Sequence, residues 1–266
     1  MNFPGTWMTT SGSLVYRVVP KAACSTIGQI MFYSDHGAFF DGDIHDAKEG
    51  LHKWALEESR VPIAEAVAAH RGVSFTCVRN PYRRVLSSFF DKIAGVQRNG
   101  QRYRQNVLPD MTKKYGIVVD GDFDQIAMFR RFLLFARDTI RFRKPIEPDI
   151  HWSAQAGHLS TFVANGGRFD HIFHAEAFDD GMKSVLKGAE TPVPVDLGAV
   201  PRFNESAGHG PKQAHPTEAY FDDLAQHLVR EVYRKDFRLF GYDPNDPSRK
   251  GPKREIDLDE VHSKLA

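Results

Sequence analysis

The chain has 266 residues, and its 35 Lys and Arg residues balance 34 Asp and Glu residues to give a formal net charge of +1. Hydrophobic residues make up 41% of the chain, which is enough for a buried core and excludes disorder throughout. A near-neutral chain does not fit a general nucleic-acid binder, which is usually clearly basic. Two cysteines, Cys24 and Cys77, are too few for a disulfide framework.

The length predicts one large domain or two small ones. No run approaches the roughly 18 apolar residues needed to cross a bilayer. The first residues, MNFPGTWMTTSGS, have neither the basic start nor the apolar stretch of a secretory signal. We therefore expect a cytoplasmic protein without a transmembrane segment, and the missing signal and anchor favour a bacterial source. The sequence does not indicate an oligomeric state.

The first part of the chain alternates between predicted strands and helices. Residues 1–13 are small and polar and predict an irregular lead-in, and a β-rich run over 14–19 that ends at Pro20 predicts a buried strand. Asn80 and Pro81 suit the cap and the first position of a later helix. The elements that follow the first strand are expected to be a helix over 25–36, a loop or lid over 37–53, a helix over 61–72, a strand over 73–79 and a helix over 82–95.

The second part of the chain continues the alternation. After a polar stretch without a clear period over 96–116, the pattern predicts an amphipathic helix over 122–137, a strand over 169–176, a helix over 178–188, a proline-rich connection over 191–201 and a helix over 217–237. From Pro244 onward the chain is charged, with a weak helix at its end. We divide the chain into the lead-in 1–13, a main domain 14–243 and a charged tail 244–266. Repeated strand, loop and helix units predict an α/β fold with a mostly parallel sheet, in which ligands bind at the carboxyl ends of the strands.

A loop of small residues joins the first strand to the first helix in the sequence VPKAACST. Successive backbone N–H groups in such a turn can bind anionic oxygens, and the following helix N-terminus adds its dipole. Lys21 supplies a mobile positive charge, and Ser25 and Thr26 can donate hydroxyls to a phosphate. The alternative is an ordinary strand–helix turn with a surface lysine. The loop lacks the glycines of the G-x-x-x-x-G-K-S/T pattern, which disfavours an ATP or GTP hydrolase.

A second strand–helix junction has the sequence CVRNPYRRVLSSFFDK. Arg79 follows the strand, where a guanidinium can bind a phosphate with two hydrogen bonds. Ser87 lies eight residues later, and the helix can bring it back toward the same anion. Arg84 either adds to this site or faces solvent, and Arg79 itself could instead form a structural ion pair. Two anion sites at neighbouring strand ends indicate a ligand with phosphates at both ends.

Together the two segments resemble the nucleotide-binding signature of sulfotransferases that use 3′-phosphoadenosine-5′-phosphosulfate (PAPS). The similarity is to the carbohydrate sulfotransferase superfamily, which includes heparan-sulfate 2-O and chondroitin/HNK-1 types and bacterial relatives. In that family a P-K-x-x-x-S/T-S/T loop holds the 5′-phosphosulfate, which the resemblance assigns to Lys21, Ala22, Ala23, Cys24, Ser25 and Thr26. A V-R-D/N-P-x-x-R-x-x-S block holds the 3′-phosphate, and its arginine and serine fall on Arg79 and Ser87.

The resemblance covers residues 14–243 and implies a P-loop-like three-layer sandwich, with a mostly parallel central sheet flanked by helices. This chain departs from the family at two positions. The family often has Asp where Asn80 stands and a hydroxyl residue where Ala22 stands. One contact of the loop with the nucleotide is therefore expected to come from the backbone alone.

The implied reaction is an in-line transfer of the sulfuryl group from PAPS to a hydroxyl, with 3′,5′-bisphosphoadenosine as the product. Like phosphoryl transfer, it needs an aligned acceptor, stabilisation of the charge on the departing phosphate oxygen, and removal of a proton. Lys21 suits the second task, which the loop's backbone donors share. The scheme needs no metal, and the sequence shows no closely spaced ligand cluster that demands one.

The general base is sought among twelve histidines. His45 is the first choice, because it lies in a glycine-punctuated loop between the two motifs, where Asp43 or Asp46 could orient it. His52 is the second choice and His151 the third. The alternatives are that His45 is a solvated loop residue and that His151 shapes the acceptor cleft.

Local clusters of basic residues indicate the chemical class of the acceptor. Residues 130–144 carry six basic side chains and one acidic side chain, and residues 98–114 carry five and one. Such local excesses could attract an anionic glycan or its lipid-linked form. Two other classes stay open: a P-loop-type nucleotide kinase or phosphotransferase, which predicts ATP binding with Mg²⁺, and a non-catalytic nucleotide- or glycan-binding protein, which predicts binding without turnover.

Overall fold

The computed structural model describes residues 5–42, 44, 72–95, 107–201 and 213–266. The chain divides into two compact units, each assembled from segments that are distant in sequence. The first unit combines residues 1–78, 155–204 and 256–266, and the second combines residues 79–154 and 205–255. The sequence boundaries at 13 and 243 do not coincide with those of the units, because both units contain residues from the middle and from the end of the chain.

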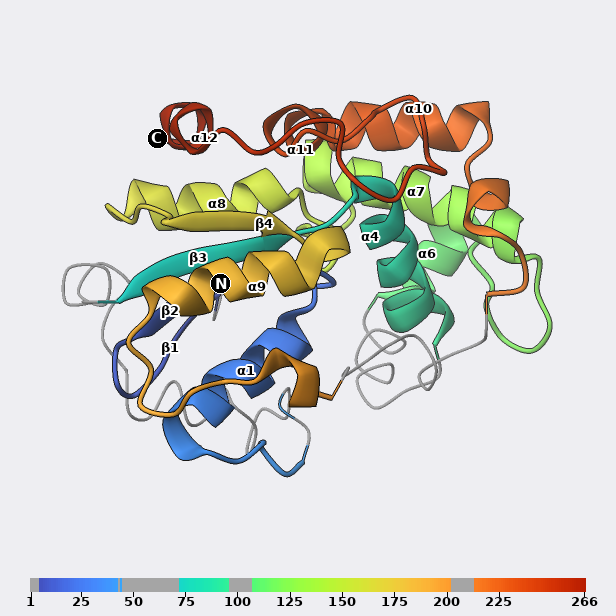
Figure 1. Ribbon diagram of the computed structural model, residues 1–266. Coiled ribbons are helices and arrows are strands. Elements are labelled where there is room, and N and C mark those ends of the chain that lie inside the picture. The colour runs from blue at the N-terminus through green and yellow to red at the C-terminus, as the bar shows by residue number, and fades with distance from the viewer. Residues whose placement is uncertain (1–4, 43, 45–71, 96–106, 202–212) are drawn as a thin grey trace. The chain divides into compact units, whose positions relative to one another are not determined.

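Four strands of the first unit, within the described residues, form one sheet (Figure 1). In spatial order they are β1 (Thr6–Met8), β2 (Leu14–Arg17), β3 (Val73–Val78) and β4 (His171–His174). β1 is antiparallel to β2, whereas the β2–β3 and β3–β4 pairs are parallel. The carboxyl ends of β2, β3 and β4 therefore lie at one edge of the sheet, as the sequence predicted.

β1 corrects the expectation that residues 1–13 are irregular. Its three residues pair with β2 from Thr6 opposite Arg17 to Met8 opposite Val15, and Trp7 is buried. A three-residue strand has too short a pattern to be recognised locally. Its stability comes from the ladder to β2 and from the contact of the Trp7 ring with Tyr16, at 5.8 Å between ring centroids.

Helices cover both faces of the sheet in the first unit (Figure 1). On one face, the rings of Tyr16, Phe75 and Phe173 stack across three neighbouring strands. Glycines allow helices to approach this layer: a Cβ at Gly28 of α1 (Cys24–His36) would meet Trp7, and one at Gly181 of α9 (Phe178–Gly188) would meet Phe173.

The opposite face is reached by the alternate residues of the strands. Arg17, next to Tyr16, is buried there, and its Nε donates to the carbonyl oxygen of His158 in α8 (Gln155–Ala164) at 2.8 Å. The unit therefore has the three-layer α/β architecture that the resemblance implied. The helix α8 was not predicted from the sequence.

The end of the tail belongs to the first unit. The predicted weak helix is α12 (Leu258–Leu265), which packs against α8. His262 Nε2 accepts a hydrogen bond from the Phe169 amide at 2.9 Å, and burial lowers the pKa of His262. Two short 3₁₀ helices, η2 (Ala175–Ala177) and η3 (Leu197–Ala199), complete the described helical elements of this unit.

The second unit is helical in its described residues. Its elements are α4 (Pro81–Ser88), the π-helix η1 (Phe89–Ala94), α6 (Leu108–Tyr115), α7 (Gln125–Phe142), the 3₁₀ helix η4 (Thr217–Tyr220), α10 (Asp223–Val232) and α11 (Arg234–Leu239). Aromatic rings fill its core: Phe89 contacts Phe129 and Phe132, and Trp152 packs on Phe132.

Two sequence expectations are corrected in this unit. The helix α6 lies in a stretch that showed no clear period, and the single helix expected over 217–237 is divided into three. The division has a local cause, since the Asp222 side chain accepts from the Ala225 amide and caps a new helix. The predicted helix over 61–72 lies almost wholly outside the described residues.

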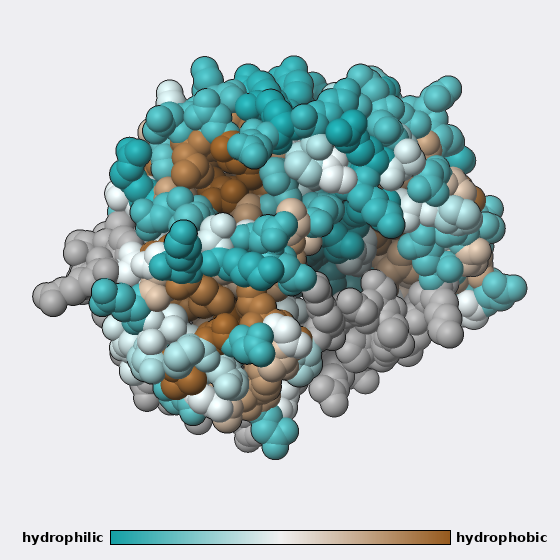
Figure 2. All heavy atoms as spheres, viewed as in Figure 1, coloured by the Kyte–Doolittle hydropathy of each residue, from teal (hydrophilic) through white to brown (hydrophobic). Residues whose placement is uncertain are grey.

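Polar residues cover most of the face seen in Figure 2, and apolar ones gather in recesses between them. Large apolar side chains exposed at the described surface are Val118, Phe142 and Leu224. In the part of the chain that the structure describes, no helix is both long and apolar enough to span a membrane.

Candidate active site

The loop between β2 and α1 has an unusual backbone. Lys21 and Ala23 are left-handed, with φ of 68° and 58°, although neither is glycine. Each such residue costs about 1–2 kcal/mol relative to an ordinary conformation, and residues of this kind gather at functional sites. Turns that contain left-handed residues form concave surfaces of backbone N–H groups that bind anions. The loop thus has the backbone expected of a phosphate cradle.

The start of α1 strengthens this property. Ala23 occupies the N-cap position and forms no side-chain capping bond, and the first turn carries no acidic residue. The positive end of the helix dipole is therefore not neutralised by acidic side chains of its own first turn. Ser25 and Thr26 are buried in this turn, whereas Cys24 is half-buried. Lys21 is half-buried at the entrance of the loop, and the methyl of Ala22 is fully buried.

Tyr16 lies on the strand below this loop and is fully buried. Burial raises its pKa well above the ordinary value, and the nearby thiols Cys24 and Cys77 act in the same direction. Tyr16 therefore stays neutral, so its hydroxyl brings no negative charge close to an anion in the loop.

The second motif begins as the sequence predicted. Arg79 is the first residue after β3, the Asn80 side chain accepts from the Tyr82 amide at 2.9 Å, and Pro81 opens α4. Within residues 79–88, all side chains are buried except those of Arg79, Arg83 and Ser87, which are half-buried and spaced by four residues. Arg83 and Ser87 are one turn apart and lie on one side of α4, whereas Arg79 precedes the non-helical N-cap residue Asn80. Of the two residues assigned to the 3′-phosphate, Ser87 therefore lies on the accessible side of α4, and Arg79 is half-buried just before the helix.

Arg84 neither adds to this site nor faces solvent. It is 1% exposed, and its two terminal nitrogens donate to the carbonyl oxygens of Ser153 at 2.7 Å and Ile150 at 3.1 Å. Next to it, the buried Ser88 hydroxyl lies 2.6 Å from the His151 carbonyl oxygen. Arg84 thus holds the 150–153 segment against α4. Its neighbour Arg83 points to a different side of the helix and has a different role.

His151 is the one candidate base that lies within the described residues, since His45 and His52 fall outside them. Its Nδ1 is 2.5 Å from Asp149 Oδ1, and its side chain is 21% exposed. A carboxylate at Nδ1 fixes the tautomer that leaves Nε2 as the proton acceptor. Asp149 was not among the residues predicted for the site, although a carboxylate two residues before a histidine is a local signal for such a pair.

The basic stretch 130–144 is largely compensated in the folded chain. Arg130 pairs with Asp222, Arg141 with Glu231, and Arg143 with Glu147. Counts along the sequence miss such partners because two of these acids come from segments about 90 residues away. The expected attraction for an anionic acceptor is therefore weakened here. Residues 98–106 of the other basic stretch lie outside the described residues.

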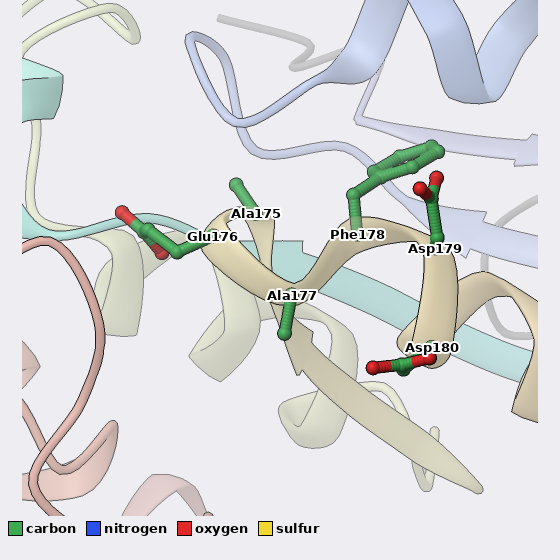
Figure 3. A pocket seen from close by; sticks show the side chains of 6 residues that line it. All are labelled: Ala175, Glu176, Ala177, Phe178, Asp179 and Asp180. Atoms are coloured by element: carbon green, nitrogen blue, oxygen red, sulfur yellow. The ribbon is translucent and has the colours of Figure 1, made fainter.

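A small pocket lies at the carboxyl end of β4. It is lined by consecutive residues, namely Ala175, Glu176, Ala177, Phe178, Asp179 and Asp180. Figure 3 shows the three carboxylates pointing in different directions, with Asp179 beside Phe178. In the described part of the chain, no group of three or more His, Cys, Asp or Glu side chains is placed to hold a metal ion. The stretch FDHIFHAEAFDD over 169–180, which contains this turn, is also a weaker point of similarity to the carbohydrate sulfotransferases.

Comparison with known proteins supplies the family. The model of the sulfotransferase family matches residues 4–243. Carbohydrate sulfotransferase 10 from Gallus gallus is 27% identical over 180 residues, which is 63% of this chain and 46% of that protein. The Danio rerio protein of the same name is 24% identical over 181 residues, with the same coverage of 63% and 46%.

The chain spans about half the length of these curated relatives. Both are animal proteins, so they do not support the expected bacterial source. No solved structure matches the chain. The family match, in contrast, extends over most of the sequence and includes both strand–helix junctions. The chain therefore belongs to the sulfotransferase family.

Proposed function

We propose that this chain transfers the sulfuryl group of PAPS to a hydroxyl of a carbohydrate, free or lipid-linked. The observation that carries the proposal is the left-handed backbone at Lys21 and Ala23, directly before the N-terminus of α1 and at the carboxyl end of β2. Such a turn suits an anionic 5′-phosphosulfate, and family membership supplies the class of reaction.

The proposed nucleotide contacts follow the two motifs. The 5′ end binds the loop through Lys21, Ala22, Ala23, Cys24, Ser25 and Thr26, and the 3′-phosphate binds Arg79 and Ser87. Ala22 and Ala23 have no polar side-chain atom, so each can meet the nucleotide only through its backbone. The Ala23 N–H is the proposed donor, because the Ala22 N–H donates to the Val19 carbonyl oxygen at 3.2 Å. The half-buried positions of Lys21, Arg79 and Ser87 support these roles, since each side chain is partly accessible and partly held by the protein.

In the proposed reaction, the acceptor oxygen forms a bond to sulfur while the bond from sulfur to the bridging phosphate oxygen breaks. The electron pair of the broken bond stays on the phosphate of 3′,5′-bisphosphoadenosine. Lys21 stabilises this charge, and a general base takes the proton of the acceptor hydroxyl. The scheme uses no metal ion.

We retain His45 as the proposed base and His151 as its competitor, which the hydrogen bond to Asp149 favours. Separate His45→Ala, His52→Ala and His151→Ala variants distinguish them. The variant that lacks the base should lose the acidic limb of the pH–rate profile near pH 6.5, with nucleotide affinity nearly unchanged. If all three variants keep the limb, none of these histidines is the base.

Calorimetric titration with 3′,5′-bisphosphoadenosine tests the proposal, with ATP and Mg²⁺ as the control. We expect binding of the bisphosphate without metal and no comparable binding of ATP with Mg²⁺. The reverse preference would indicate a phosphotransferase. Binding without release of bisphosphate from PAPS, in the presence of desulfated chondroitin or heparan chains, would indicate a binding protein or a different acceptor. The cytoplasmic location stays a prediction.

A further inference from the structure

The accessible side of the segment 79–88 carries a residue that the sulfotransferase motif does not include. Arg83 lies midway between Arg79 and Ser87, four residues from each, and all three are half-buried while the residues between them are buried. Arg83 and Ser87 are one turn apart on the same side of α4, and Arg79 directly precedes the N-cap of this helix, so a phosphate bound by Arg79 and Ser87 lies close to Arg83. In this chain that residue carries a positive charge.

The segment 244–249, which we name the C-terminal strap, holds this region in place. Three side chains of the motif donate to its backbone carbonyl oxygens. Tyr82 Oη donates to Pro244 at 2.6 Å, Arg83 Nη2 to Ser248 at 3.3 Å, and Asn80 Nδ2 to Arg249 at 2.9 Å. The family match ends at residue 243, so the strap lies beyond the part of the chain that it covers.

The strap has a fixed shape of its own. Asp246 Oδ1 accepts from the amides of Ser248 at 3.0 Å and Arg249 at 3.1 Å, and Asp243 Oδ1 accepts from the Asn245 amide. The hydrogen bond from the Lys253 ammonium lowers the pKa of Asp243, and the hydrogen bond from the Ser248 hydroxyl lowers the pKa of Asp246, so both carboxylates are charged at neutral pH. The carbonyl that meets Arg83 is therefore presented by an ordered turn.

Most hydrogen-bond donors of the Arg83 guanidinium are unused within the described residues. A guanidinium carries five N–H groups, and among the described residues its hydrogen bond to Ser248 uses one of them. Its Nε is buried and makes no hydrogen bond to any described residue. No ion pair joins Arg83 to an acidic side chain in the same part of the chain. A guanidinium that is positioned in this way and lacks a counter-ion is suited to a phosphate.

We propose that Arg83 is a third ligand of the 3′-phosphate, positioned by the C-terminal strap. The inference rests on the proposed function, because it needs a nucleotide with a 3′-phosphate. It assigns Arg83 a role in selectivity: the added charge favours a nucleotide with a phosphate at the 3′ position over one with a hydroxyl there. Arg84, its neighbour in sequence, has no part in this selectivity.

The test compares two nucleotides in calorimetric titrations, 3′,5′-bisphosphoadenosine and adenosine 5′-monophosphate. Arg83→Gln should lower the affinity for the bisphosphate about 10-fold, because a charged hydrogen bond to the 3′ group is lost. The affinity for the monophosphate should change by no more than about twofold. Arg83→Lys keeps the charge and should recover part of the loss. Arg234→Gln removes a positive charge from α11 in the same unit and should change neither affinity.

The strap is tested by Asp246→Ala, which loosens the turn without touching the segment 79–88. In the wild-type background it should lower the affinity for the bisphosphate about threefold. In the Arg83→Gln background it should have no further effect, because both changes act through one contact. Additive losses would exclude positioning by the strap. If thermal unfolding shows that Arg83→Gln is not folded, Arg83→Lys and Asp246→Ala provide the test instead.

The outcomes separate this inference from the proposed function. If the wild-type chain binds both nucleotides equally or not at all, the proposed function fails, and the inference fails with it. If the wild-type chain prefers the bisphosphate and Arg83→Gln keeps the full preference, only the role of Arg83 is overturned. Equal weakening of both nucleotides also overturns it, since that result would show a general loss of structure.

Discussion

The two phosphate motifs are built in different ways. The loop before α1 depends on backbone shape, with left-handed Lys21 and Ala23 around a buried Ala22 and no side-chain cap. The segment 79–88 depends on side chains, because Asn80 caps the helix and Arg84 is bound to two carbonyl oxygens. The backbone motif therefore requires small residues, whereas the side-chain motif requires particular functional groups.

This contrast predicts where substitutions are tolerated. In the loop, Ala22, Ala23 and Cys24 can change as long as the new residues are small and allow the same backbone. In the segment 79–88, neighbouring residues of one type have different roles, and replacing the buried member changes folding while replacing the accessible member changes binding.

Lys21→Ala should reduce turnover by about 10²–10³-fold, the loss typical of a single donor to the charge of a transition state. The measurement is release of 3′,5′-bisphosphoadenosine from PAPS with desulfated chondroitin or heparan chains as acceptors. Cys24→Ser is the control within the same loop, and it should stay active because a hydroxyl is also small. An inactive but folded Cys24→Ser variant would contradict the view that only size matters at this position.

Arg79→Ala should weaken the binding of 3′,5′-bisphosphoadenosine by about 1.5–3 kcal/mol, which is the contribution of a charged hydrogen bond. Adenosine-5′-phosphosulfate lacks the 3′-phosphate and should be much less affected. Calorimetric titration with both ligands gives the difference. Equal losses for the two ligands would remove Arg79 from the 3′ site.

Arg84→Met should lower the free energy of unfolding by about 2 kcal/mol, because the carbonyl oxygens of Ile150 and Ser153 lose their donors inside the protein. Denaturant titration measures this loss. Arg83→Met is the matched control, since its side chain is half-buried, and it should cost clearly less stability. Similar losses for the two variants would show that helix rotation does not separate their roles.

Ala23→Gly should leave stability unchanged or raise it by about 0.5–1 kcal/mol, because glycine adopts the left-handed conformation without strain and this gain exceeds its entropic cost. Ala22→Gly should instead lower stability by about 1 kcal/mol, since it deletes a buried methyl and adds backbone freedom. Thermal unfolding of the two variants gives the comparison. A loss of stability in Ala23→Gly would contradict the left-handed backbone of the loop.

Local sequence was sufficient for the two strand–helix junctions. The helix expected over 25–36 is found at Cys24–His36, and the strand expected over 73–79 is found at Val73–Val78. Asn80 caps its helix as predicted. These features depend on runs of apolar residues and on caps within a few positions, so the information that determines them is local.

Other features depend on partners that are distant in the sequence. β1 exists because it pairs with β2, and the charges of Arg130 and Arg141 are compensated by acids about 90 residues later. The tail expected to be separate supplies the strap to the second unit and α12 to the first. Arg83 and Arg84 are neighbours of one type. Helix rotation turns them to different sides of α4, and the packing of the 150–153 segment decides that Arg84 is the buried one. Such differences arise from packing, which no local pattern encodes.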